Sequence, residues 1–187
     1  MTMGMDQIIY KIKLLWYKMT HKDPMDLYID NYRKKGAIIG ENVRAFSPVT
    51  AAEPYLLTIG DNVTISHGVV FLTHDNSVIK CKEKIGTDLV GRVTIGRDCF
   101  IGCNTVLLPG IELAAGTIVG AGSIVTKSVT ESGLIIAGNP ARIIGKCDTF
   151  FQKYKETAFD FQPDGRRMTF AQRKACILQN QDKLMKK

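Results

Sequence analysis

The chain has 187 residues, of which 45% are hydrophobic and 23% are charged, and its formal net charge is +7. This length and composition predict one globular domain with small appendages and exclude an intrinsically disordered chain. The longest uninterrupted apolar stretch near the N-terminus, residues 14–17, is much shorter than the roughly 20 residues of a membrane-spanning helix, so we expect no such helix there.

Residues 1–36 are predicted to form an N-terminal helical cap. Apolar side chains recur at helical spacing within residues 6–19 and form one face: Ile8, Ile12, Leu15 and Met19. Such a face either packs on the end of the next domain or lies on a membrane surface, for which Trp16 and the neighbouring lysines are suited. Lys11 and Lys13 interrupt any apolar core of a signal peptide, so we expect a cytoplasmic protein.

The positive charge lies at the two ends of the chain. Residues 1–35 carry 7 basic and 4 acidic side chains, residues 36–147 carry 9 of each, and residues 148–187 carry 9 basic and 5 acidic. A nucleic-acid-binding surface combines clustered basic residues with aromatic ones, and no such cluster occurs here. We therefore expect no nucleic-acid partner, and we interpret the basic ends as solvated surface.

A six-residue repeat organises the region from residue 37 to residue 147. Aliphatic or aromatic side chains recur in phase at Ile59, Ile65 and Phe71, and again at Ile95, Ile101, Leu107, Leu113, Val119 and Val125. A period of six fits neither a helix nor simple alternation, so each unit is expected to be a short strand followed by a turn. Stacked units of this kind predict a β-solenoid with the periodic side chains inside. The alternative, a sandwich, would show longer and more variable spacings.

The repeat breaks after Phe71 and resumes at Val93, which leaves residues 74–92 as a predicted loop excursion. Loops of this length on a regular scaffold are commonly functional. This one begins with His74, whose imidazole titrates near neutral pH and is able to take a proton from an acceptor hydroxyl. Glu53 and Asp75 are two candidates for a carboxylate that orients such a base or binds the acceptor, and the sequence leaves the choice between them open.

Residues 148–187 are predicted to form a helical C-terminal extension. Residues 150–159 and 169–187 have helical patterns, and the turn-forming residues 162–165 separate them. The chain also contains an odd number of cysteines, none in a CxxC pair, which we interpret as reduced thiols: Cys81, Cys99, Cys103, Cys147 and Cys176.

The repeat and residues 65–75 (ISHGVVFLTHD) resemble the hexapeptide-repeat acyltransferases. The resemblance is to the galactoside, maltose and capsular-sugar O-acetyltransferases and, more loosely, to the streptogramin acetyltransferases. It implies a mainly β chain wound as a left-handed parallel β-helix, a homotrimer with active sites between subunits, and His74 as the catalytic base. His67 lies within the repeat and is interpreted as structural, and His21 as incidental.

Residues 120–127 (GAGSIVTK) and 137–146 (AGNPARIIGK) are similar to the two coenzyme A segments of this family. The resemblance implies acetyl-CoA as the acyl donor, with no metal. It assigns coenzyme contacts to Cys103, Ala121, Thr126, Lys127, Arg142 and Lys146. The backbone N–H of Cys103 is expected to face the thioester oxygen, and the basic side chains are expected to face the phosphates. Phe100 stands where galactoside-type members often have tryptophan, so its contact with the pantetheine arm is expected to differ.

The implied reaction is direct transfer of an acetyl group to a sugar hydroxyl, on a polysaccharide precursor or a nucleotide-linked sugar. An amino sugar or an antibiotic is the alternative acceptor at the same site. A γ-type carbonic anhydrase would need three histidines around zinc, whereas the repeat region contains only His67 and His74. A non-catalytic assembly scaffold is the remaining alternative, and it requires no function for His74.

Overall fold

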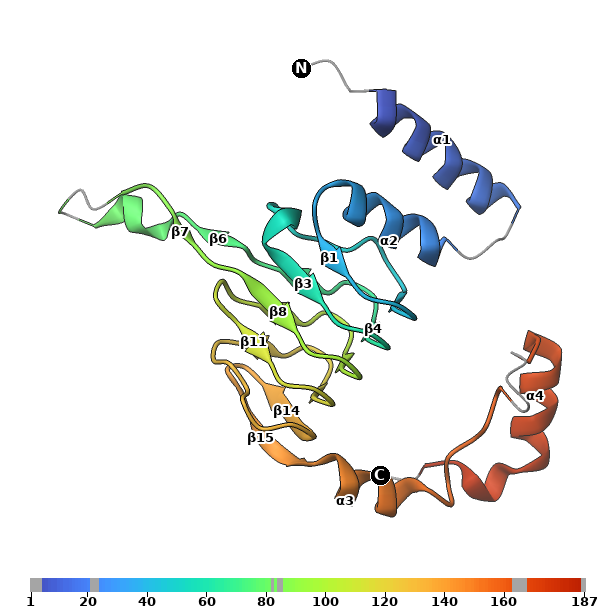
Figure 1. Cartoon of the computed structure of the whole chain (residues 1–187). Helices are drawn as coiled ribbons and strands as arrows, with labels where there is room; N and C mark the ends of the chain where they lie inside the picture. Colours follow the sequence, from blue (N-terminus) through green and yellow to red (C-terminus); the bar gives the residue numbers. More distant parts are fainter. Residues whose placement is uncertain (1–4, 21–23, 82, 84–85, 163–167, 186–187) are drawn as a thin grey trace. The chain divides into compact units, whose positions relative to one another are not determined.

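The computed structural model describes residues 5–20, 24–81, 83, 86–162 and 168–185 (Figure 1). The chain divides into two compact units, residues 1–147 and residues 148–187. Among the described residues, no helix is long and apolar enough to cross a membrane.

The first unit begins with two helices, α1 (Met5–Met19) and α2 (Met25–Lys34). Helix α2 packs against the first two strands and buries Tyr28, Ile29 and Tyr32. Its Arg33 donates hydrogen bonds to the carbonyl oxygens of Ile39, at 3.1 Å, and Gly40, at 2.6 Å. Helix α2 therefore covers the end of the stacked strands that follow, as the exposed end of a solenoid requires.

Short strands then form three sheets. Sheet A has the order β1 (Ile38–Ile39), β3 (Leu57–Ile59), β8 (Val93–Ile95) and β11 (Glu112–Leu113). Sheet B has the order β2 (Arg44–Ala45), β4 (Thr64–Ile65), β9 (Phe100–Ile101), β12 (Ile118–Val119), β14 (Leu134–Gly138) and β15 (Ala141–Lys146). Sheet C has the order β5 (Val70–Phe71), β10 (Val106–Leu107) and β13 (Ile124–Val125). Because the chain visits A, B and C in turn with parallel pairing, it winds as a three-sided solenoid.

The register of the strands confirms the six-residue period. Ile95 pairs with Leu113, so equivalent positions in successive coils are 18 residues apart, which is three units per coil. The periodic side chains point inward and are at most 1% exposed: Ile59, Ile65, Phe71, Ile95, Ile101, Leu107, Leu113, Val119 and Val125. One aliphatic ladder along each sheet thus supplies the core.

Small hydroxyl side chains share the interior with this ladder. Thr117 and Ser123 are fully buried, and their hydroxyls donate to the carbonyl oxygens of Ala114, at 2.7 Å, and Gly120, at 2.6 Å. Buried hydroxyls are tolerated when they are hydrogen-bonded. These bonds tie each turn to the coil that it closes.

The turns between sheets A and B stack as well. Asn42, Asn62 and Asp98 all have positive φ there, a conformation that Asn and Asp tolerate better than most residues. Asn42 Nδ2 donates to Asn62 Oδ1 at 3.3 Å, and Asn62 Nδ2 donates to Asp98 Oδ1 at 3.1 Å. A ladder of polar side chains therefore runs along this edge of the solenoid.

The winding ends at β14. This strand pairs in parallel with β12 and antiparallel with β15, so the chain folds back and adds no further coil. The predicted solenoid region, residues 37–147, thus ends in a hairpin. A further coil would need a turn after a strand of two or three residues. Residues 141–146 instead continue as one long strand, β15, that pairs along β14.

The excursion between β5 and β8 forms a hairpin of its own. Strands β6 (His74–Asp75) and β7 (Leu89–Val90) pair antiparallel, with a short 3-10 helix η2 (Ser77–Lys80) between them, and the hairpin extends away from the coils (Figure 1). Ile59 and Ile95 pair although they are 36 residues apart. The excursion therefore adds one coil length of chain and returns it in register.

The second unit contains helices α3 (Cys147–Tyr154) and α4 (Phe170–Gln179) and a 3-10 helix η4 (Gln181–Lys183). The prediction of a helix over 150–159 was wrong at both ends. Helix α3 ends at Tyr154 because the amide and hydroxyl of Thr157 both donate to the Tyr154 carbonyl oxygen. Helix α4 starts at a capping box of Thr169 and Gln172 and ends eight residues before the predicted end. The predicted turn falls largely on residues 163–165, outside the described residues.

The close approach of the coils predicts a cost for any side chain at Gly96. A Cβ atom there would lie 2.7 Å from the backbone N of Ala115, whereas at Gly145 it would meet nothing within 4 Å. We expect Gly96→Ala to lower the free energy of unfolding by about 1–3 kcal/mol, and Gly145→Ala to change it by less than about 0.5 kcal/mol. Chemical denaturation at matched protein concentration measures both. Equal changes in the free energy of unfolding would contradict the close packing of Gly96 against the next coil.

Candidate active site

His74, the first residue of the excursion, faces Glu53 from the preceding coil. Its Nδ1 lies 3.0 Å from both carboxylate oxygens of Glu53. An ionised carboxylate only accepts hydrogen bonds, so Nδ1 carries the proton and Nε2 of the neutral ring keeps its lone pair. The side chains of His74 and Glu53 are 38% and 24% exposed, so a substrate can reach the pair. The arrangement therefore presents Nε2 as a base.

An insertion in the first coil places Glu53. Ile39 pairs with Ile59 across 20 residues, two more than in the regular coils, and the extra length lies in the turn between sheets C and A, which we call the C–A corner. Glu53 directly precedes a short 3-10 helix, η1 (Pro54–Leu56), in this turn. The excursion leaves the solenoid at the C–A corner of the next coil, so the two irregularities meet.

Thr73 holds Glu53 in place. The Glu53 backbone N–H donates to Thr73 Oγ1 at 3.1 Å, and the Thr73 hydroxyl donates back to the Glu53 carboxylate. Thr73 is 1% exposed, so this pair of bonds is shielded from water. In the sequence, only its position directly before His74 points to this role, and Thr73 was not among the predicted site residues.

A second support comes from helix α2. The Tyr32 hydroxyl accepts a hydrogen bond from the Ala51 backbone N–H at 3.1 Å, and Tyr32 is 8% exposed. The segment that carries Glu53 is thereby anchored to the N-terminal cap. No sequence pattern connects Tyr32 with residues 51–53, so sequence reasoning had no means of finding this contact.

The hydrogen bonds shift the pKa values of both partners. The Thr73 hydroxyl and then the His74 ring lower the pKa of Glu53, which keeps it ionised. The hydrogen bond and the charge of Glu53 raise the pKa of His74 above its ordinary value of 6.5. Glu53 therefore stabilises the imidazolium that forms when Nε2 takes a proton.

Asp75 has a different partner. Its Oδ1 accepts the Ser77 backbone N–H at 2.8 Å, and this bond lowers the pKa of Asp75. Asp75 thus closes the turn that starts η2. Of the two carboxylates that the sequence left open, Glu53 contacts the ring of His74.

Cys103 and Ala121 lie in the turns between sheets B and C, which we call the B–C corner. The His67 carbonyl oxygen accepts the Asn104 N–H at 2.9 Å, and the Cys103 carbonyl oxygen accepts the Gly122 N–H at 2.7 Å. His67, Cys103 and Ala121 are therefore equivalent positions in three successive coils. All three side chains are exposed.

Sheet C separates this corner from His74. Within one coil, His67 and His74 stand at opposite edges of the sheet, and seven residues of extended chain span roughly 20 Å. A single chain therefore does not bring Cys103 beside the base.

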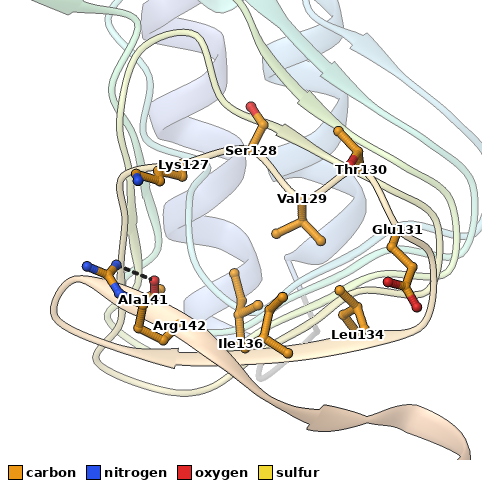
Figure 2. Close-up of a pocket in the computed structure, with 10 residues that line it drawn as sticks. Lys127, Ser128, Val129, Thr130, Glu131, Leu134, Ile136, Ala141 and Arg142 are labelled. Carbon is orange, nitrogen blue, oxygen red and sulfur yellow. Dashed lines mark hydrogen bonds between the residues drawn. The ribbon is translucent and has the colours of Figure 1, made fainter.

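Lys127 and Arg142 line one cavity of about 500 Å³ at the end of the solenoid, over an apolar floor that includes Val129, Leu134 and Ile136 (Figure 2). Figure 2 shows the two basic side chains on one side of this cavity and Glu131 on the other.

The remaining predicted coenzyme contacts lie near this cavity but do not line it. Thr126 is half-buried at the end of β13, directly before Lys127. Lys146 is paired with Glu131, with its Nζ 3.0 Å from Oε1, so a carboxylate already offsets its charge. The structure therefore brings together two of the three predicted cations. Within the described ranges, no group of three His, Cys, Asp or Glu side chains could hold a metal ion.

The chain is similar to several known proteins. Residues 92–127 match the family described as bacterial transferase hexapeptide (six repeats). Protein CapG of Staphylococcus aureus is 36% identical over 151 residues, which cover 79% of this chain and 86% of CapG. Galactoside O-acetyltransferase of Escherichia coli (strain K12) is 34% identical, and the match covers 63% of this chain and only 60% of that protein.

The fold has solved counterparts as well. A hexapeptide-repeat containing acetyltransferase from Vibrio cholerae O1 biovar eltor, complexed with acetyl coenzyme A, superposes with a TM-score of 0.55 at 27% identity. The superposition covers 60% of this chain and 61% of the other.

The contact between Glu53 and His74 predicts the result of a titration. Replacing Glu53 by Gln removes the carboxylate charge and should lower the pKa of His74 toward its ordinary value, as followed by NMR of the imidazole. Asp75→Asn is the matched control, since it also removes one adjacent negative charge but breaks no bond to the ring. A larger fall with Asp75→Asn than with Glu53→Gln would contradict the assignment.

Proposed function

Since the chain belongs to the hexapeptide-repeat acyltransferases and is an acetyl-CoA-dependent acetyltransferase, we propose that it transfers the acetyl group to a sugar hydroxyl with His74 as general base. The observation that carries the proposal is the hydrogen bond from His74 Nδ1 to Glu53, which leaves Nε2 as a proton acceptor at an exposed corner. The left-handed winding of the family belongs to the same proposal. Parallel pairing around three sheets supports a solenoid, and the similarity to the family supports its left hand.

The proposed reaction is a direct transfer in one site. His74 Nε2 takes the proton of the acceptor hydroxyl while the oxygen attacks the thioester carbonyl carbon. The negative charge on the carbonyl oxygen is stabilised by a backbone N–H at Cys103. When the tetrahedral intermediate collapses, the C–S bond breaks and the imidazolium returns its proton to the leaving sulfur. The products are an acetyl ester and coenzyme A, and Glu53 stabilises the charged ring between the two proton transfers.

The site is completed by a neighbouring copy in a homotrimer. The base lies at the C–A corner and Cys103 at the B–C corner, on opposite edges of sheet C, so direct transfer requires the two corners to come from different chains. A threefold arrangement of identical solenoids places the C–A corner of one copy against the B–C corner of the next. The outer face of sheet C carries Val70, Val106 and Ile124, a half-buried aliphatic row suited to such a contact.

The B–C corner and the adjoining cavity fit coenzyme A. Ala121 and Gly122 are exposed and carry little or no side chain, which allows the pantetheine arm to lie against the coil. Lys127 and Arg142 supply positive charge for the pyrophosphate and the 3'-phosphate. Lys146 contributes less, because Glu131 is its partner.

A sugar hydroxyl is the favoured acceptor, because one relative, galactoside O-acetyltransferase of Escherichia coli, is named for such a reaction. A polysaccharide precursor or a nucleotide-linked sugar is the proposed class. An acetyl-CoA transfer screen over hydroxyl sugars, amino sugars and small antibiotics tests it. Acetylation of amines alone would overturn the choice of oxygen.

Removal of the His74 imidazole is expected to slow the chemical step of acetyl transfer. His74→Ala should lower kcat by about 100-fold or more, since general base catalysis contributes 10²–10⁴-fold, and should leave the KM for acetyl-CoA nearly unchanged. His67→Ala is the matched control, and it should lower kcat by less than about 10-fold. Steady-state transfer to the best acceptor of the screen measures both. Full activity of His74→Ala would show that His74 is not the general base.

The cavity at the end of the solenoid predicts a defect in coenzyme binding. Lys127→Gln combined with Arg142→Gln should raise the KM for acetyl-CoA by about 5- to 10-fold with kcat retained, which corresponds to about 1 kcal/mol of partly exposed charge contact. Lys146→Gln is the comparison variant, and its effect should be smaller. The difference should shrink at high ionic strength. An equal or larger effect of Lys146→Gln would contradict the cavity assignment.

A further inference from the structure

Helix α1 contacts α2 through one face only. Tyr10, Leu14 and Tyr17 follow one another at helical spacing and are half-buried, whereas no residue of α1 is fully buried. Tyr10 lies close to the tyrosines of α2, and burial there raises the pKa of its hydroxyl. This face, formed by Tyr10, Leu14 and Tyr17, attaches α1 to α2 and so to the rest of the first unit.

The opposite face of α1 is apolar and exposed. Seven large apolar side chains, each between 42% and 78% exposed, make up what we call the apolar stripe: Met5, Ile8, Ile9, Ile12, Leu15, Trp16 and Met19. At 100° per residue they occupy an arc of about 120° that contains no polar residue. A monomeric protein rarely leaves a continuous apolar surface of this kind to water.

Lysines border the stripe. Lys11 follows one edge of the arc and Lys13 the other, with Lys18 beside Lys11, while Asp6 is the one acidic residue among residues 5–19. Lysine stems can lie along an apolar surface while their ammonium groups reach phosphate groups. An apolar arc between two cationic edges, with Trp16 inside it, matches a helix that lies in the headgroup region of a bilayer.

The same charges argue against two stripes facing one another, as a twofold contact between copies would require. If two stripes faced one another, the lysines at their edges would meet like charges. Helix α2 does not cover the stripe either, since it contacts the Tyr10 side of α1. With 15 residues, α1 is about 22 Å long, which suits a helix lying in the membrane surface and is too short to cross the bilayer.

We propose that α1 binds an anionic membrane surface through the apolar stripe and lies parallel to that surface. The ligand is a lipid bilayer with negatively charged headgroups. The stripe supplies the apolar contact, and Lys11, Lys13 and Lys18 supply the preference for anionic lipid. The proposal does not depend on the acetyl transfer reaction, because none of these residues belongs to the active site.

Trp16 provides a direct readout, because it is the only tryptophan of the chain and belongs to the stripe. The full chain is titrated with vesicles of phosphatidylglycerol and, separately, of phosphatidylcholine. We expect a blue shift of the tryptophan emission and co-sedimentation with phosphatidylglycerol vesicles, and at least about tenfold weaker partitioning onto phosphatidylcholine. No binding to phosphatidylglycerol, or equal binding to both lipids, overturns the proposal.

Two variants of α1 with the same charge change sharpen the test. Ile12→Glu places a carboxylate in the middle of the stripe, whereas Gln7→Glu places it outside the arc on the same helix. Ile12→Glu should lower partitioning onto phosphatidylglycerol by about tenfold or more, and Gln7→Glu by less than about threefold. Circular dichroism checks that both remain folded, and acetyl transfer to a small acceptor in solution should be unchanged in both.

Equal losses in the two variants would show a general charge effect and would overturn the role of the stripe. A blue shift that depends on protein concentration without lipid, and that Ile12→Glu abolishes, would show that a second copy covers the stripe. That result would also overturn the membrane proposal. Neither outcome bears on the catalytic role of His74, so failure here and failure of the proposed function are distinguishable.

Discussion

Parallel hydrogen bonding between successive coils, over a ladder of identical aliphatic positions, is the interaction on which the first unit depends. The amide of Gly96 donates to the carbonyl oxygen of Leu113 at 2.8 Å, and the amide of Gly102 to that of Val119 at 2.9 Å. Because strands pair at a spacing of about 4.8 Å, each position along one coil is repeated at nearly the same place in the next. A residue that departs from the repeat therefore lies at a defined corner of the solenoid and at a defined position along its axis.

Two departures from this regularity create the candidate site. The insertion that carries Glu53 and the excursion that starts at His74 lie at the same corner in adjacent coils, so strand register alone brings them together. The buried Thr73 hydroxyl then keeps the carboxylate ionised and aimed at Nδ1. The rigidity of the coils thus decides the tautomer of the imidazole, and the tautomer decides which nitrogen is free for chemistry.

The same geometry distributes function over separate parts of the chain. The base stands on one edge of sheet C and the small-residue corner on the other, which is why the proposed transfer uses two copies. The cations Lys127 and Arg142 gather at the end of the solenoid, where β15 turns back. Helix α1 contributes to none of these and presents its apolar stripe elsewhere, so the proposed binding to a membrane surface is separable from acetyl transfer.

The sequence by itself determined the solenoid, its inward-facing ladder and the excursion that begins at His74, because each six-residue unit is local and repeats its pattern along the chain. It also indicated helical ends, although the limits of α3 and α4 depended on Thr157 and on the capping box at Thr169, which patterns of apolar residues do not report. Only the tertiary structure decided between Glu53 and Asp75, identified Thr73 and Tyr32, and separated Lys146 from the other two cations. These contacts join residues of different coils or helices, 15 to 21 positions apart in the sequence, and they exist only when strand register aligns those positions.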